Sequence, residues 1–239
     1  MEIVNMKNQE SAWTGRWLSG PGARVSDGSE FTLEEMFSGK MKSQKPVEER
    51  LHPVVYFKKV FPLSQEIWTA QLTITCQGIY QTFINGEAVT DRIFTPDYTD
   101  YSDFLMYQTY EIADLLRTGE NVLAVEGYAD RISVQGGSAQ FGDQLALLAD
   151  VDITFENGEE LHFGNDESFS LGEGKHRYAD IQISEKQDLR LNNDWKTSST
   201  RVVQEALFSF GAISYPRIGF CPSGVMPSAI WIHSLLTVP

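Results

Sequence analysis

The chain has 239 residues, of which 41% are hydrophobic, 12% aromatic and 22% charged. This composition is typical of a folded protein with a sizeable core and excludes wholesale disorder, and the length predicts one large domain or one domain with an appendage. A net charge of −14, with no basic patch to offset it, repels phosphate backbones and anionic lipids, so we expect neither nucleic acid nor a membrane surface as a partner.

The chain begins MEIVNMKNQESAWTGRW, which lacks the basic region and apolar stretch of a secretory signal. No apolar run approaches the ~20 residues that span a bilayer. Two cysteines, Cys76 and Cys221, are too few for a disulfide framework, and neither lies at metal-ligand spacing from a histidine or from the other. We therefore expect two buried thiols and, by default, a cytoplasmic protein.

Residues 1–50 are polar and irregular. They carry Trp13 and Trp17, a Gly/Pro turn at residues 20–22, and a capping box at residues 32–35 that predicts a short helix ending near Gly39. We expect this N-terminal segment to pack on the following domain through its tryptophan-bearing start.

From Val54 onward, short alternating runs follow one another between turn residues, a pattern typical of an all-β sandwich. Residues 71–76 alternate in polarity, and their inward face holds Leu72, Ile74 and Cys76. Residues 80–84 and 87–89 flank the dipeptide Asn85-Gly86, which predicts a tight hairpin between two antiparallel strands.

The clearest strand covers residues 145–155, where apolar and polar residues alternate along the whole run. Its inward face holds Leu145, Leu147, Ala149, Val151, Ile153 and Phe155. The dipeptide Asn157-Gly158 then predicts a type I′ turn into a second strand at residues 161–163. Residues 122–125 are predicted to form a further strand. No long amphipathic helix lies between strands to act as a crossover, so we predict an all-β, antiparallel sandwich with short helical turns.

The last stretch, residues 207–239, contains no Asp or Glu and a single arginine, Arg217. Its apolar segments at residues 212–215 and 229–232 are either closing strands of the sandwich or a surface that packs against a further domain or subunit. We therefore divide the chain into an irregular segment (1–50), a β-sandwich module (51–206) and an apolar C-terminal segment (207–239).

Familiar catalytic and metal-binding motifs are missing from the sequence. The glycines form no phosphate-binding loop, no serine lies in a GxSxG turn, and the four histidines are widely separated. His162 is most simply a strand residue. The 33 acidic residues contain no pair that the sequence marks for acid/base chemistry, so we predict no catalytic residue.

One stretch, residues 94–104 (FTPDYTDYSDF), interleaves carboxylates with aromatic residues between two predicted strands. Aromatic rings offer flat apolar faces to a sugar, and carboxylates accept hydrogen bonds from its hydroxyl groups or bind Ca²⁺. Tyr98, Asp100 and Tyr101 are therefore candidate carbohydrate-binding residues, with Ca²⁺ as a candidate cofactor whose ligands are not identified. The alternative is structural: the tyrosine side chains cover the end of the sandwich core, and the aspartate side chains cap turns.

Several segments, taken in order and spacing, resemble the N-terminal β-sandwich of bacterial α-L-rhamnosidases, and the resemblance covers residues 13–195. Besides the tryptophan-bearing start, these segments are VYFKKVF (55–61), GIYQTFING (78–86), TPDYTDY (95–101), YQTYEIADLL (107–116), GEN (119–121), FGDQLALL (141–148) and DESF (166–169). The resemblance implies a jelly-roll, galactose-binding-like sandwich that is not itself catalytic and that binds L-rhamnose with calcium in some members. Hydrolysis in that family takes place on a large (α/α)₆ barrel farther along the chain, for which 239 residues leave no room.

One loop departs from the pattern of the family. After the strand at residues 122–125 the family has a Gly-Asp-Gly-Trp-Tyr-like loop, where this chain has EGYADR at residues 126–131. Tyr128 and Asp130 are the residues that can take the place of the missing tryptophan in part. We therefore add both to the candidate carbohydrate-binding residues.

The resemblance implies a noncatalytic carbohydrate-recognition or scaffold module, associated with the hydrolysis of rhamnose-containing glycans and partnered by a glycan or a catalytic domain. Two alternatives stay open. In one, the apolar C-terminal face makes the chain a protein–protein interaction module, either as a homo-oligomer or as the partner of a catalytic subunit. In the other, the chain is a minimal glycosidase that uses loop carboxylates such as Asp100 and Asp130.

Overall fold

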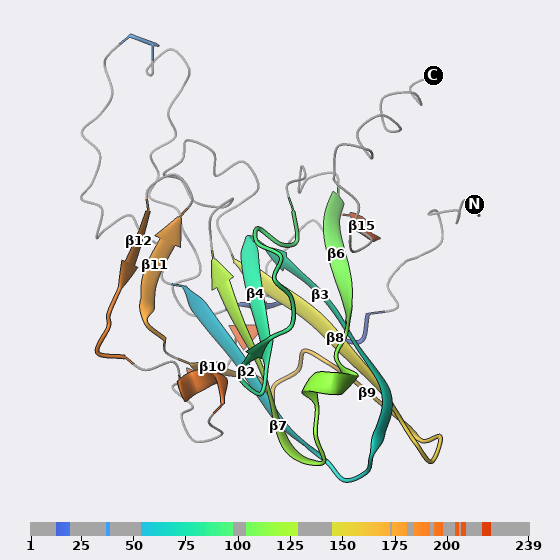
Figure 1. Ribbon diagram of the computed structural model, residues 1–239. Helices are drawn as coiled ribbons and strands as arrows, with labels where there is room; N and C mark the ends of the chain where they lie inside the picture. Colours follow the sequence, from blue (N-terminus) through green and yellow to red (C-terminus); the bar gives the residue numbers. More distant parts are fainter. Residues whose placement is uncertain are drawn as a thin grey trace, which may run out of the picture.

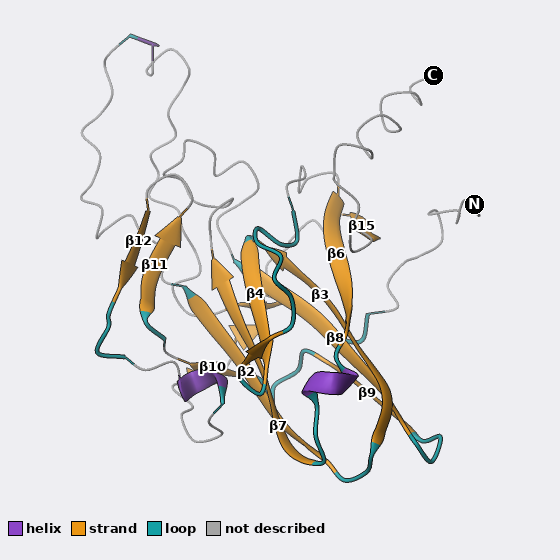
Figure 2. Cartoon of the chain, viewed as in Figure 1, coloured by secondary structure: helices purple, strands orange, loops and turns teal. Residues whose placement is uncertain are grey.

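The computed structural model describes residues 13–19, 37–38, 54–97, 104–128, 145–172, 174–180, 184–191, 194–197, 204–205, 207–208 and 217–220. Strands dominate these residues, with short 3₁₀ turns between them (Figure 2). The longer strands are β2 (Val55–Leu63), β3 (Ile67–Gln77), β4 (Ile79–Ile84), β6 (Phe104–Glu111), β7 (Gly119–Tyr128), β8 (Ala146–Phe155), β9 (Glu160–Gly164) and β11 (His176–Asp180). The shorter elements are β1 (Leu18–Ser19), β5 (Glu87–Ala88), η2 (Ala113–Leu115), β10 (Ser170–Gly172), β12 (Ser184–Gln187), η4 (Asp194–Lys196), β13 (Gln204–Glu205), β14 (Leu207–Phe208) and β15 (Arg217–Phe220).

The strands form two sheets and a separate hairpin (Figure 1). One sheet has seven strands in the order β14-β1-β8-β3-β6-β15, with β9 also paired to β8, and the other has six in the order β13-β10-β2-β7-β4-β5. All described pairs are antiparallel except β15 with β6, which run parallel. The predicted all-β, antiparallel class is therefore confirmed, while the jelly-roll connectivity stays a prediction.

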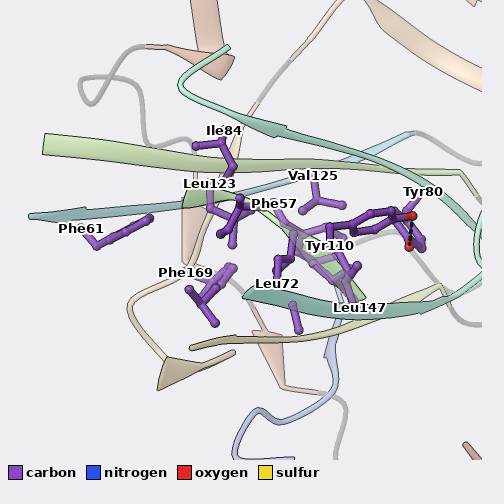
Figure 3. Close-up of a cluster of buried hydrophobic side chains, with 14 of the residues drawn as sticks. Phe57, Phe61, Leu72, Tyr80, Ile84, Tyr110, Leu123, Val125, Leu147 and Phe169 are labelled. Carbon is purple, nitrogen blue, oxygen red and sulfur yellow. Dashed lines mark hydrogen bonds between the residues drawn. The ribbon is translucent and has the colours of Figure 1, made fainter. Parts of the chain in front are cut away.

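The hydrophobic core lies between the two sheets, as in a β-sandwich. The predicted inward face of residues 145–155 is buried along its whole length, and Leu72, Ile74 and Cys76 of β3 are fully buried beside it. Phe57, Leu123 and Val125 of the six-stranded sheet pack against Leu72 and Leu147 of the seven-stranded sheet (Figure 3). The period-two alternation of the sequence thus identifies the core directly.

The two Asn-Gly hairpins differ in turn type. Asn85 and Gly86 both have positive φ angles, 52° and 90°, as a type I′ turn requires. At the β8–β9 hairpin the positive φ falls on Gly158 alone, at 83°, and the Gly158 amide donates to the Phe155 carbonyl. The hairpin is confirmed but its predicted type I′ turn is wrong, because the loop is longer and needs only one left-handed residue, its glycine.

Both ends of the described chain contact the seven-stranded sheet. The Asp150 carboxylate accepts hydrogen bonds from the backbone amides of Thr14 and Gly15, at 2.9 and 2.8 Å. Trp17 is buried against this sheet, and β14 and β15 pair with β1 and β6. Of the short helix predicted after residues 32–35 the structure describes only residues 37–38, where Phe37 is helical. The segments 212–215 and 229–232 lie outside the described residues, so the division into domains stays a prediction.

Two smaller predictions concern single residues. The thiol of Cys76 is buried as predicted, whereas Cys221 lies outside the described residues. His162 is confirmed as a strand residue of β9, where its Nε2 lies 2.7 Å from the Thr14 hydroxyl. In the described part of the chain, no helix combines the length and apolar character needed to cross a membrane.

Candidate functional site

The two loops predicted to bind a sugar leave the sandwich at the same end. Thr95, in the first loop, forms an isolated β-bridge with Tyr80. Tyr128, where the second loop begins, pairs with Ile79. Because Ile79 and Tyr80 are consecutive residues at the start of β4, the bases of both loops lie side by side, at the upper end of the sandwich in Figure 1.

The predicted site residues themselves are only partly placed. Tyr98, Asp100, Tyr101 and Asp130 lie outside the described residues, and Tyr128 is described as the last backbone position of β7. The structure therefore brings together the bases of the loops, while the five side chains stay a prediction. Among the described residues no group of three or more His, Cys, Asp or Glu is arranged to hold a metal ion, and the Ca²⁺ proposal concerns loop carboxylates beyond that set.

A buried hydrogen-bond network fixes the base of the first loop. The Tyr80 hydroxyl donates to Gln108 Oε1 at 2.6 Å, and Gln108 Nε2 donates to the Pro96 carbonyl at 2.7 Å. The Tyr80 backbone amide donates to the Thr95 carbonyl, and the Thr95 hydroxyl donates back to the Tyr80 carbonyl. The hydroxyls of Tyr80 and Tyr110 lie 3.2 Å apart (Figure 3). Burial raises the pKa of Tyr80 well above its ordinary value, so its hydroxyl stays a proton donor.

The residues on either side of this base adopt positive φ angles, and the two before it are apolar and exposed. Phe94 has a φ of 62° and Asp97 a φ of 104°, and the Asp97 amide donates to the Phe94 carbonyl at 3.0 Å. Large side chains rarely adopt this left-handed region, and such residues concentrate at functional sites. Ile93 and Phe94 are also 66% and 47% exposed. The sequence places Phe94 at the start of the predicted loop at residues 94–104, but it gives no signal for the positive φ angle of Phe94 or for the exposure of Ile93.

A buried charged cluster lies next to the base of the second loop. Glu126 precedes Tyr128 by two residues on β7, and its side chain is 1% exposed. Its Oε1 lies 3.5 Å from Lys196 Nζ of η4, and its Oε2 lies 3.8 Å from His176 Nδ1 of β11. His176 Nε2 lies 3.7 Å from the Glu185 carboxylate of β12. The cluster thus joins the β11–β12 hairpin and η4 to the six-stranded sheet.

Aromatic side chains surround this charged cluster. The Tyr56 ring meets Trp195 edge to face at 4.7 Å between centroids, and Lys196 Nζ lies 3.3 Å from the Phe83 ring centroid. Tyr56 also accepts a hydrogen bond from the His176 amide and donates one to its carbonyl. Burial, helped by the charge of Glu126, raises the pKa of Tyr56, and burial lowers that of Lys196 against the opposing pull of Glu126. Each buried charge therefore depends on its partners.

The fold places the chain in the class of two-sheet β-sandwich modules. Among solved structures it is similar to α-L-rhamnosidases from Dictyoglumus thermophilum (TM-score 0.68, 21% identity, 87% of this chain and 22% of that one) and Aspergillus terreus (TM-score 0.66, 22% identity, 82% and 21%). It is also similar to a Streptomyces avermitilis α-L-rhamnosidase complexed with L-rhamnose (TM-score 0.62, 22% identity, 67% and 16%). At these identities the likeness shows the fold.

The sequence comparisons identify the family. Residues 65–211 match the model of the α-L-rhamnosidase N-terminal domain. An α-L-rhamnosidase of Formosa agariphila is 28% identical over 195 residues, which cover 79% of this chain and 19% of the relative. The chain belongs to the α-L-rhamnosidase N-terminal domain family, and it spans about a fifth of the length of two curated relatives from Formosa agariphila that it matches.

Proposed function

We propose that the chain is a noncatalytic carbohydrate-recognition module that binds rhamnose-containing glycans through the two loops at the start of β4. The observation that carries the proposal is the pairing of consecutive residues, Ile79 and Tyr80, with the bases of both loops. The proposal places one ligand between the two loops, where it would contact the tyrosines and aspartates of both. Membership of the α-L-rhamnosidase N-terminal domain family supports the choice of sugar.

The rigid bases of the loops favour recognition of a small ligand. Tyr80 and Gln108 are almost fully buried, hydrogen-bond to each other, and hold Thr95 and Pro96 by three further hydrogen bonds. The Glu126 cluster holds the strand that leads into the second loop. Because the scaffold is ordered before the ligand arrives, less conformational entropy is lost on binding.

A thermal unfolding titration tests the proposal. The chain is titrated with L-rhamnose, D-galactose and D-glucose in turn, each with Ca²⁺ or with a chelator. At a rhamnose concentration one hundred times the dissociation constant, the native state gains ~2.7 kcal/mol, which raises the midpoint by roughly 5 to 10 °C in a domain of this size. We expect this shift with L-rhamnose in Ca²⁺.

Matched variants locate the site. Asp100→Asn and Asp130→Asn should each abolish most of the rhamnose-induced shift. Asp114→Asn is the control, because Asp114 is an exposed carboxylate in η2 at the other end of the sandwich. Absence of a shift with every sugar, with or without Ca²⁺, would contradict the proposal.

A further inference from the structure

A β-bulge at the start of β3 turns a tryptophan out of the core. Ile67 pairs with Phe155 and Thr69 with Thr154, so Trp68 is an extra residue in β3. Farther along the strand the even-numbered positions, Ala70 onward, face the core. Without the bulge Trp68 would face inward with them. Instead its side chain is 70% exposed, although tryptophan is mostly buried in folded proteins.

The outer face of β3 and β6 continues from Trp68 as a row of polar side chains. Gln71 of β3 donates to the Glu111 carboxylate of β6. Farther along, the hydroxyls of Thr73 and Thr109 lie 3.3 Å apart. All four residues are exposed or half-buried. The face therefore offers amide, carboxylate and hydroxyl groups at the spacing of a cross-strand ladder.

A pair of aromatic rings lies at the other end of this row. Tyr107, next to the Gln108 that pairs with Ile74, meets Trp13 edge to face at 5.7 Å between centroids. Trp13 and Tyr107 are both half-buried. From Trp68 to Ile74 the strand rises ~20 Å. Aromatic rings thus lie at the two ends of a polar strip that is long enough for several sugar rings.

The charges of this face select among ligands. The outward positions of β3, β6, β8 and β9 hold no Lys or Arg among the described residues. Such a face, on a chain of net charge −14, repels anionic polymers. Between the rings the face is polar, whereas a protein interface needs an apolar centre. Rings that stack on sugars, with hydrogen-bonding groups between them, match a neutral glycan.

We propose that the outer face of β3 and β6 binds an extended, neutral glycan chain, with Trp68 as its main stacking platform. This surface begins at the end of β3 opposite to the loops at the start of β4. Its main platform is therefore separate from the loop site, and the surface contacts a polymer rather than a single terminal sugar.

Affinity electrophoresis of the chain in gels containing galactomannan, xyloglucan or hydroxyethylcellulose tests the proposal. We expect at least one of these neutral polysaccharides to retard the wild type, and Trp68→Ala to weaken that retardation about tenfold or more. Leu189→Ala, which removes an apolar side chain that is 82% exposed between β12 and η4, should migrate like the wild type.

Two further readouts separate the possible outcomes. Trp68→Ala should keep the wild-type thermal midpoint and any rhamnose-induced shift, so a failure of this proposal is distinct from a failure of the loop site. Equal retardation of Trp68→Ala and wild type would overturn the proposal, and so would a wild type that none of the polysaccharides retards. A dimer in sedimentation that Trp68→Ala dissociates, without retardation, would assign the face to a second copy of the chain instead.

Discussion

At the scale of single residues, Phe94 combines backbone strain with an exposed ring at the base of the first loop. A left-handed conformation costs a non-glycine residue about 1 to 2 kcal/mol. Because about half of the Phe94 side chain is exposed, burial of the ring offsets only part of this cost. Its conformation is imposed by the hydrogen bonds on either side, from Thr95, Tyr80 and Asp97. We interpret Phe94 as a residue kept for contact with a ligand rather than for stability.

Replacement of Phe94 by asparagine tests this interpretation. Asparagine tolerates the left-handed region, so Phe94→Asn should raise the free energy of unfolding by about 1 kcal/mol and weaken the rhamnose-induced thermal shift. Urea unfolding measures the first effect. Phe94→Ala is the control, because it removes the ring and keeps the backbone strain, and it should show no gain. A loss of stability in Phe94→Asn would mean that the ring is part of the core.

Tyr80 gives a pH-dependent prediction. Its pKa is raised by burial, so the folded state holds the phenolic proton above the unfolded pKa of about 10. The stabilisation is complete below pH 10 and is lost as the pH rises further. Above pH 10, the free energy of unfolding of the wild type should fall more steeply with pH than that of Tyr80→Phe, and the difference in slope should approach ~1.4 kcal/mol per pH unit above about pH 11. Parallel slopes in urea unfolding would contradict this.

At the scale of elements, the β11–β12 hairpin and η4 are held on β7 by Glu126. The carboxylate is almost fully buried, and its partners His176 and Lys196 come from elements 50 or more residues away. A sequence that is read locally shows only a glutamate at the end of an apolar run. The strands could be predicted because alternation is local, whereas this cluster could not, because only the tertiary fold brings its charges together.

Removal of the Glu126 charge should loosen the hairpin. Glu126→Gln leaves the Lys196 and His176 side chains without their buried partner, at a cost of about 3 kcal/mol. Backbone amides of β11 and β12 should then exchange with solvent faster. Glu185→Gln is the matched control, because that side chain is 53% exposed and its loss should cost less than about 1 kcal/mol. Equal effects of the two variants in urea unfolding would refute a clamping role for Glu126.

At the scale of the whole molecule, the sandwich presents two surfaces of different character. One end gathers the bases of two loops at β4, and the outer face of the seven-stranded sheet carries Trp68 and its polar strip. The sequence predicts the core and the loop composition, since Leu147 and its neighbours on β8 alternate with polar residues. It does not predict the exposure of Trp68. The one-residue bulge moves Trp68 to the outer face of the sheet, and the alternation of polar and apolar residues gives no sign of where the bulge lies. Nor does the sequence predict that β15 pairs in parallel with β6.

Binding of L-rhamnose by the loops at the start of β4 is the property on which the proposed function rests. The most direct test is an NMR titration of the isotope-labelled chain with L-rhamnose in Ca²⁺, followed by the backbone amide shifts. We predict that the largest changes fall on Thr95, Asp97, Gly127 and Tyr128, while Gly158 in the β8–β9 hairpin at the opposite end stays unchanged. Saturable shifts confined to other parts of the chain, or no saturable shifts at all, would contradict the proposed function.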